Sequence, residues 1–200
     1  MDQSYLKNIL NQVAGGGMDP QEAMEQLKDL PFQDLGFANI DQHRNIRTGQ
    51  AETIYCEGKT PEQVSVIIDK MKEKNSNILG TRASAEVFQK VKDIVPEAVY
   101  YPEARMIVVK KRKDEILTEK TIAVVTAGTS DIPVAEEAAV TAEAMGNPVD
   151  RIYDVGVAGI HRLLSKRDRL QAANVVIVVA GMEGALASVV GGLVSKPVIA

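Results

Sequence analysis

A turn rich in small and hydroxyl-bearing residues follows an apolar, β-branched run at 122–126: Ala127-Gly128-Thr129-Ser130-Asp131. Such a turn can bind an anion, because Gly128 permits a tight bend and the N–H groups of the next helix face the ligand. Ser130 or Asp131 can cap that helix, and Pro133 fits its first turn. The same residues also fit an ordinary connection between a strand and a helix, so both interpretations stay open.

The same order of residue types recurs after a second apolar run at 175–179: Ala180-Gly181-Met182-Glu183-Gly184-Ala185. Two such connections in one domain place two loops at the same edge of a sheet. In an open parallel sheet, ligands bind in the crevice outside the carboxyl ends of the strands. The residues that we expect to contact a ligand in these two loops are Gly128, Thr129, Ser130, Gly181 and Met182.

A third loop follows a further predicted strand and carries Gly159, His161 and Arg162. Arg162 suits a second anion and His161 can move protons near neutral pH, so we expect both at the site. Asp131 and Glu183 are candidate acids, bases or ligands of a divalent metal ion such as Mg²⁺. Each residue alone also fits a cap or a surface position. The convergence of three loops on one edge is what indicates a site.

The elements that must position these loops alternate regularly in residues 118–200. The pattern predicts strands at 121–126, 149–155, 174–179 and 197–200, and helices at 133–145, after 162 to about 173, and at 184–194. Strands alternating with helices predict an α/β fold with a doubly wound parallel sheet. We place the domain boundary in the charged stretch 114–120, which gives domains of residues 1–117 and 118–200.

The sequence of residues 1–117 predicts helices followed by a smaller α/β domain. Helices are expected at 5–13, from Asp19-Pro20 onward, at 60–74 and after Ser84, with strands at 52–56, 77–82, 98–101 and 105–110. Between them, His43 with Arg44 and Arg47 could bind an anion, although a surface loop is the favoured interpretation of 37–47.

Arg82 and Cys56 in the first domain also have two interpretations each. Arg82 follows a strand end and could hold a carboxylate or phosphate, but an ordinary surface role is favoured. Cys56 could be a nucleophile, yet it fits better as a small apolar residue of a strand.

Composition excludes several classes of function. The 200 residues are 45% hydrophobic and 25% charged, as in a globular protein. A net charge of −4 disfavours nucleic acid as a partner, and the basic run 110–113 precedes two acids, which is typical of a solvated face or linker. One cysteine excludes a disulfide framework or zinc knuckle.

No apolar run is long enough to span a membrane, and no signal segment opens the sequence. We therefore expect a cytoplasmic protein with no membrane partner. The final residues, 197–200, read as a buried strand. Because a buried strand needs further chain to cover it, this ending predicts that the native protein is longer.

Residues 120–200 resemble the aminoimidazole ribonucleotide carboxylase/mutase family, whose loops carry G-S-x-S-D, S-A-H-R and A-G-G-A-A-H-L-P-G. Ser130-Asp131, His161-Arg162 and Ala180-Gly181 match these segments in order, whereas Ala185 replaces the second histidine. The resemblance implies a three-layer α/β fold and a homo-oligomer with sites between subunits.

A closer resemblance covers nearly the whole chain and is to the LarB family, the pyridinium-3,5-biscarboxylic acid mononucleotide synthases. It is carried by L-G-F-A-N-I-D-Q-H-R, G-T-R-A-S, T-A-G-T-S-D, V-G-V-A-G-I-H-R and A-G-M-E-G-A-L. It implies carboxylation of the pyridinium ring of nicotinic acid adenine dinucleotide by CO₂ or bicarbonate, with release of AMP. This is the first step in making the nickel-pincer nucleotide cofactor of lactate racemase.

The LarB resemblance also implies roles for individual residues. The Ser130 loop would hold the nucleotide phosphate, while Asp131 and Glu183 would take the ring proton or hold a divalent metal ion. His161 would assist. The family's nucleophilic cysteine lies carboxy-terminal to residue 200, so we expect this chain to lack it and Cys56 not to replace it. The alternatives are an aminoimidazole ribotide carboxylase/mutase and a non-catalytic nucleotide-binding module.

Overall fold

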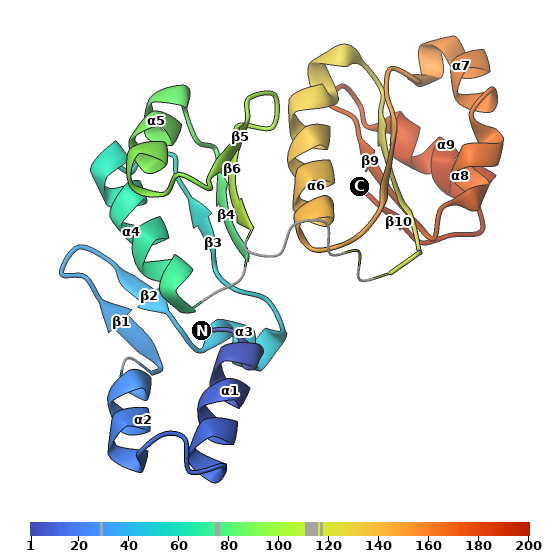
Figure 1. The fold of residues 1–200 in the computed structure, drawn as a ribbon. Coiled ribbons are helices and arrows are strands. Elements are labelled where there is room, and N and C mark those ends of the chain that lie inside the picture. The colour runs from blue at the N-terminus through green and yellow to red at the C-terminus, as the bar shows by residue number, and fades with distance from the viewer. Residues whose placement is uncertain (29, 75–76, 111–115, 117) are drawn as a thin grey trace. The chain divides into compact units, whose positions relative to one another are not determined.

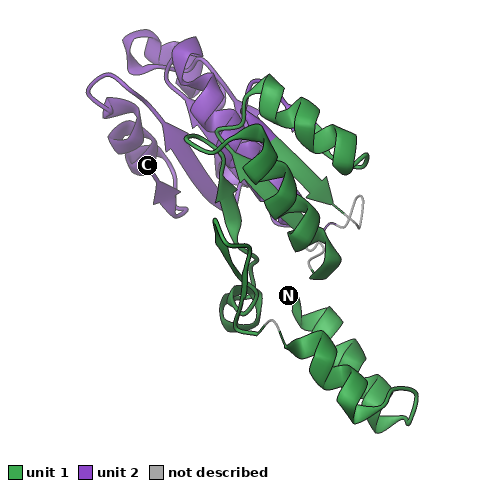
Figure 2. Ribbon diagram, turned by 90° about the vertical axis from the view of Figure 1, so that its left-hand side faces the viewer, with its two compact units in different colours: residues 1–99, 107–112 green, residues 100–106, 113–200 purple. Residues whose placement is uncertain are grey.

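The computed structural model describes residues 1–28, 30–74, 77–110, 116 and 118–200. It contains two compact units, one formed by residues 1–99 and 107–112 and the other by residues 100–106 and 113–200 (Figure 2). The predicted domain boundary between residues 117 and 118 and most of the basic and acidic run 110–115 lie outside the described residues. That boundary stays a prediction.

The second unit is built on a parallel sheet of four strands in the order β10-β9-β7-β8. The strands are β7 (Ile122–Thr126), β8 (Val149–Ile152), β9 (Val175–Val179) and β10 (Val198–Ile199). The helices are α6 (Ile132–Ala144), α7 (Ile160–Leu164), α8 (Arg167–Ala172) and α9 (Ala185–Leu193), with short 3₁₀ turns η1 (Thr129–Asp131) and η2 (Val157–Gly159). The expected alternation of strands and helices is confirmed.

Successive side chains of β7 face opposite sides of this sheet, as the pleat requires. Ala123 and Val125 are buried in a cluster with Leu163, Leu170, Leu186 and Val190 from α7, α8 and α9. Val124 is buried on the other face against Ala135 and Ala139 of α6. Helices therefore cover both faces, which makes three layers (Figure 1). The predicted doubly wound α/β fold is confirmed.

Two details of the second unit differ from the prediction. The helix expected to run to about 173 is two short helices, because α7 ends in a tight turn in which Lys166 N–H donates to the Leu163 carbonyl. The strand expected over 149–155 ends at Ile152, since Asp154 turns the backbone into the left-handed region at φ 58°.

The first unit opens with α1 (Gln3–Ala14) and α2 (Pro20–Leu27), each capped by an aspartate: Asp2 and Asp19. A mixed sheet has the order β3-β4-β6-β5, with β3 (Thr53–Tyr55), β4 (Asn77–Thr81), β5 (Val99–Tyr101) and β6 (Met106–Lys110), and its residues lie in the first unit except Tyr100, Tyr101 and Met106. Helices α4 (Pro61–Lys74) and α5 (Ala85–Ile94) pack together, and Ser84 caps α5 as predicted.

Residues 37–47, predicted as a surface loop, are partly ordered into elements. An antiparallel hairpin joins β1 (Phe32–Asp34) to β2 (Asn39–Asp41), and the helix α3 (Arg44–Thr48) follows. The loop interpretation was wrong for 39–41 and 44–47, because a three-residue strand and a five-residue helix are too short to show a periodic pattern. Among the described residues, no helix is long and apolar enough to cross a membrane.

Candidate functional site

The parallel sheet reverses its winding between β7 and β9. From β7 the chain moves to β8 on one side, and then crosses back to β9 and β10 on the other side. Accordingly α6, which follows β7, lies on one face, whereas α9, which follows β9, lies on the other (Figure 1). Such a switch point opens a crevice between the two strand ends, and ligands of open α/β sheets bind there.

Asp131 connects the two loops that flank this switch point. Its Oδ2 accepts a hydrogen bond from the Gly128 N–H at 2.9 Å, and its Oδ1 accepts one from the Gly181 N–H at 3.2 Å. The two loops expected to meet do meet, and their contact is a partly buried carboxylate. We name Gly128, Thr129, Ser130, Asp131 and Gly181 the rim.

The helix cap expected from Ser130 or Asp131 is absent from the rim. Asp131 stands at the N-cap of α6, but its side chain makes no cap hydrogen bond, because both oxygens accept N–H groups of the loops. Pro133 lies in the first turn of α6, as predicted. Thr129 and Ser130 are exposed, so their hydroxyls lie open to solvent and to a ligand.

The loop after β8 joins the rim through Thr126, the last residue of β7. The buried Thr126 hydroxyl accepts the Asp154 N–H at 2.9 Å, and the Thr126 carbonyl accepts the Val155 N–H at 3.0 Å. Gly156 then passes so close to Ala127 that a Cβ would lie 2.7 Å from the Ala127 carbonyl oxygen. The third loop is therefore fixed against the carboxyl end of β7.

Arg162 is held on two sides within this third loop. One of its Nη atoms lies 2.8 Å from Oδ2 of Asp154. Its guanidinium also rests against Gly159, where a Cβ would approach the Arg162 Nε to 2.8 Å. Gly159, expected to contact the ligand itself, thus makes room for Arg162. Sequence reasoning missed both Thr126 and Asp154, although a threonine at the end of a buried strand is a weak signal for such a role.

Three other predicted residues are not brought to the Asp131 carboxylate. His161 in α7 and Glu183 after β9 are exposed, and Met182 is 87% exposed. Within the described ranges, no hydrogen bond or ion pair joins any of them to Asp131. Glu183 has φ 38°, which holds the turn before α9 in a conformation unusual for a residue with a side chain. The catalytic roles expected for His161 and Glu183 stay predictions.

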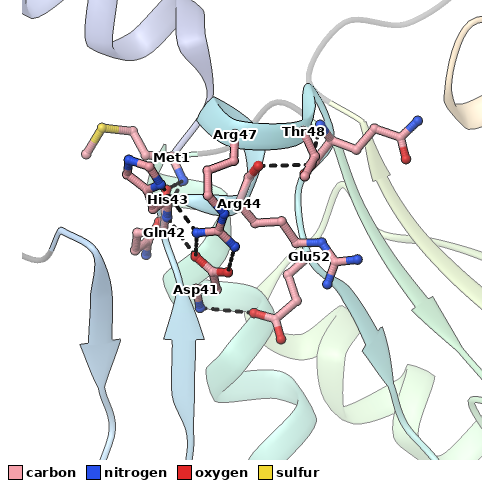
Figure 3. A network of polar contacts seen from close by, with 9 residues as sticks. Met1, Asp41, Gln42, His43, Arg44, Arg47, Thr48 and Glu52 are labelled. Atoms are coloured by element: carbon pink, nitrogen blue, oxygen red, sulfur yellow. Dashed lines mark hydrogen bonds and ion pairs between the residues drawn. The ribbon is translucent and has the colours of Figure 1, made fainter.

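Two residues of the arginine and histidine cluster of the first unit, Arg47 and His43, make internal contacts (Figure 3). Arg47 pairs with Asp41, with Nη2 at 2.8 Å from Oδ2, and its other Nη lies 3.3 Å from the His43 ring. The hydrogen bond from Arg47 lowers the pKa of Asp41. An anion at this cluster would have to compete with Asp41 for Arg47, so the rim is the stronger candidate.

Cys56 is buried like a small apolar residue, as the sequence favoured, although it directly follows β3 and is not part of that strand. It is 2% exposed, and burial raises the pKa of its thiol to about 11. Only a small fraction of the Cys56 side chain is therefore in the nucleophilic thiolate form near neutral pH. Arg82 has φ 54° directly after β4, and the choice between a surface role and an anion contact stays open.

The carboxylates do not form a preformed metal site in the described part of the chain. No group of three or more His, Cys, Asp or Glu side chains is placed to hold a metal ion there. Asp131, the candidate nearest the switch point, already accepts two N–H groups. The Mg²⁺ considered from the sequence stays a prediction.

The three-layer unit, with helices on both faces of a parallel sheet that reverses its winding, defines an α/β protein. Residues 32–112, most of which lie in the first unit, match the family model described as "LarB/PurE-like N-terminal domain", and the α/β fold is consistent with that family. An uncharacterized protein of Methanocaldococcus jannaschii is 35% identical over 204 aligned residues, which cover 97% of this chain and 79% of that relative. The chain belongs to the LarB/PurE-like family, and this membership indicates a carboxylase- or mutase-type enzyme.

Proposed function

We propose that this chain serves the carboxylation of the pyridinium ring of nicotinic acid adenine dinucleotide. The products are pyridinium-3,5-biscarboxylic acid mononucleotide and AMP, because the phosphoanhydride is hydrolysed in the same process. The observation that carries the proposal is the bridge from Asp131 to Gly128 and Gly181 across the switch point. It presents loops with exposed hydroxyls where a nucleotide phosphate would bind.

The chemistry sets what the site must supply. A pyridinium ring is electron-poor, so it does not attack CO₂ until a nucleophile has added to it. The resulting electron-rich ring can form the new C–C bond. Loss of the ring proton at that carbon and departure of the nucleophile then restore aromaticity. The site must therefore hold the nucleotide, offer a base for one proton and admit a thiol.

The residues of this chain divide these tasks. The Thr129 and Ser130 hydroxyls and neighbouring N–H groups would bind phosphate, and Arg162 would add a guanidinium. Exposed Glu183 and His161 are the candidate bases for the ring proton, since neither has to leave a structural contact first. Asp131 instead fixes the loops, because both of its oxygens are occupied by N–H donors. No step of the proposed mechanism passes through Mg²⁺.

Under this proposal, Cys56 does not supply the thiol that adds to the ring. Its side chain is buried in the first unit and its pKa is raised to about 11. As Cys56 is the only cysteine in these 200 residues, the thiol is not among them. The proposal thus assigns nucleotide binding to this chain and covalent chemistry to a thiol from elsewhere.

A calorimetric titration tests the binding part of the proposal. We expect the chain to bind nicotinic acid adenine dinucleotide and nicotinic acid mononucleotide, but aminoimidazole ribotide at least tenfold more weakly. Asp131→Ala should abolish nicotinate nucleotide binding, whereas Asp168→Asn, on the exposed side of α8, should not change it. Preferential binding of aminoimidazole ribotide would overturn the proposal in favour of a ribotide carboxylase/mutase.

Incubation with ¹⁴C-bicarbonate and nicotinic acid adenine dinucleotide tests the chemical part. Protein made from the complete native reading frame should release AMP and fix label into the pyridinium product. The 200-residue chain should bind the dinucleotide without incorporating ¹⁴C into a pyridinium product. Label fixed at full rate by the 200-residue chain would contradict the assignment of the thiol.

The buried state of Cys56 also favours a second candidate, a non-catalytic nucleotide-binding module. The same incubation separates the two functions. Tight nucleotide binding with no labelled product from the complete reading frame would support the module and reject the enzyme.

A further inference from the structure

Two residues hold the Arg162 side chain, and one of them, Asp154, lies outside the V-G-V-A-G-I-H-R segment that contains Arg162. Asp154 pairs with its Nη1 at 2.8 Å, and the absence of a Cβ at Gly159 lets the guanidinium lie against the backbone. The side chains of Arg162 and Asp154 are 39% and 50% exposed. Exposed ion pairs contribute about 0–1 kcal/mol to stability, so stability is a weak reason for this arrangement.

The backbone of Asp154 is held in an unfavourable conformation. Its backbone has φ 58°, a left-handed conformation that residues with a Cβ seldom adopt. The Thr126 hydroxyl holds this conformation by accepting the Asp154 N–H at 2.9 Å. Strained residues persist where the surroundings over-determine them, and they cluster at ligand sites. The carboxylate that orients Arg162 is thus anchored to the end of the strand that carries the rim.

We propose that Asp154 and Gly159 are positioning residues that present Arg162 to a phosphate group of the nucleotide. The ion pair occupies Nη1, while the planar guanidinium has further N–H donors on Nη2 and Nε. A guanidinium held in one plane can bind two phosphate oxygens without first losing side-chain freedom. The proposal rests on the proposed function for the identity of the nucleotide, but not for the phosphate.

The physical alternative is that Asp154 competes with the ligand for Arg162 and weakens phosphate binding. The two roles predict opposite effects of Asp154→Asn, which keeps the shape of the side chain and removes its charge. Positioning predicts weaker binding of phosphorylated ligands. Competition predicts tighter binding.

The experiment compares two ligands that differ only in one phosphate, nicotinic acid mononucleotide and nicotinic acid riboside. Asp154→Asn and Gly159→Ala should each weaken mononucleotide binding by about tenfold, the effect of one charge-assisted hydrogen bond, and leave riboside binding unchanged. Arg162→Ala should do the same, and adding Asp154→Asn to it should cost nothing more. Asp154→Glu should recover part of the affinity, with an unchanged melting temperature in every variant.

Three results would overturn the proposal: tighter or unchanged mononucleotide binding by Asp154→Asn, an equal loss of riboside binding, or full additivity with Arg162→Ala. Ribose 5-phosphate serves as a second probe. If ribose 5-phosphate binding depends on Asp154 and Arg162 while nicotinate ligands do not bind, the proposed function fails and the positioning role stands. If no phosphorylated ligand binds the wild-type chain, both fail.

Discussion

Asp131 and Gly181 are 50 residues apart in the sequence, yet the carboxylate Oδ1 of one accepts the N–H of the other at 3.2 Å. The second oxygen accepts the Gly128 N–H, so one side chain connects the loops after β7 and β9. This contact holds the two loops together before any ligand arrives. It gives Asp131 a structural role, and the role in proton transfer or metal binding expected from the sequence stays a prediction.

Removal of the Asp131 bridge should loosen both loops. Asp131→Ala leaves the Gly128 and Gly181 N–H groups without their acceptor, so the free energy of unfolding should fall by about 1–3 kcal/mol. Urea denaturation measures this loss, with Asp168→Asn as a control that removes an exposed carboxylate from α8. Amide exchange at Gly181 should accelerate in the Asp131 variant alone. Equal stability of the two variants would show that the bridge contributes nothing.

The approach of Gly156 to Ala127 predicts a sharp contrast between glycines. Gly156→Ala places a Cβ 2.7 Å from a backbone carbonyl oxygen, so it should destabilise the fold by about 1–3 kcal/mol. Gly192→Ala, inside α9 with open space around its Cβ position, should stabilise it by about 0.5–1 kcal/mol. Thermal unfolding of both variants checks the opposite signs. A neutral Gly156→Ala would mean that the third loop is not fixed to β7.

Thr126→Val tests the anchor of the Asp154 turn. The change keeps the shape of the buried side chain but removes the acceptor of the Asp154 N–H, which should cost about 1–3 kcal/mol of stability. Hydrogen exchange at the Asp154 amide should rise at the same time. Protection of that amide at the wild-type level would contradict the hydrogen bond.

Cys56 predicts a change in stability at alkaline pH. Burial raises the pKa of the thiol to about 11 from an ordinary value of 9.0, so the unfolded chain loses this proton first. The stabilising effect is therefore complete below pH 9 and is lost as the pH rises toward 11. Urea denaturation across this range should show the decline for the wild type, and Cys56→Ala should lack that part of it. Rapid alkylation of native Cys56 at pH 8 would contradict its burial.

The Asp41–Arg47 pair predicts the opposite pH dependence. Arg47 lowers the pKa of Asp41, so the pair stabilises the protein above the ordinary pKa of the carboxyl and loses this effect as the pH falls below it. Arg47→Ala should raise the Asp41 pKa toward its ordinary value, measured by NMR titration of the side-chain carboxyl. An unchanged titration would show that the pair does not form in solution.

Periodicity predicted the sheet but not the contacts that build the site. The runs at β7 and β9 are apolar and β-branched, and helices alternate with them, so the parallel sheet and the shared edge followed directly. The role of Asp131 did not, because an aspartate at a helix start usually caps that helix. The hydrogen bond from the Gly181 N–H to Asp131 forms because the fold brings the two residues together, and nothing in the local sequence indicates it.

Asp154 shows a second limit of the sequence. The positive φ of Asp154 cannot be recognised from composition or from residue spacing. The end of β8 at Ile152 and the ion pair between Asp154 and Arg162 were therefore not predictable. The hairpin β1–β2 was missed for a different reason, since three-residue strands carry too few alternations to detect. The contacts of Asp131 and Asp154 that the sequence did not predict depend on tertiary distance and on backbone geometry, respectively, and not on residue type.

The most direct test of the rim is an NMR titration of the ¹⁵N-labelled chain with nicotinic acid mononucleotide. We predict saturable shifts of the Gly128, Ser130 and Gly181 amides at one shared dissociation constant, and loss of all of them in Asp131→Ala. Shifts confined to residues 41–48 of the first unit, or no shifts at any ligand concentration, would contradict the assignment of the nucleotide to the rim.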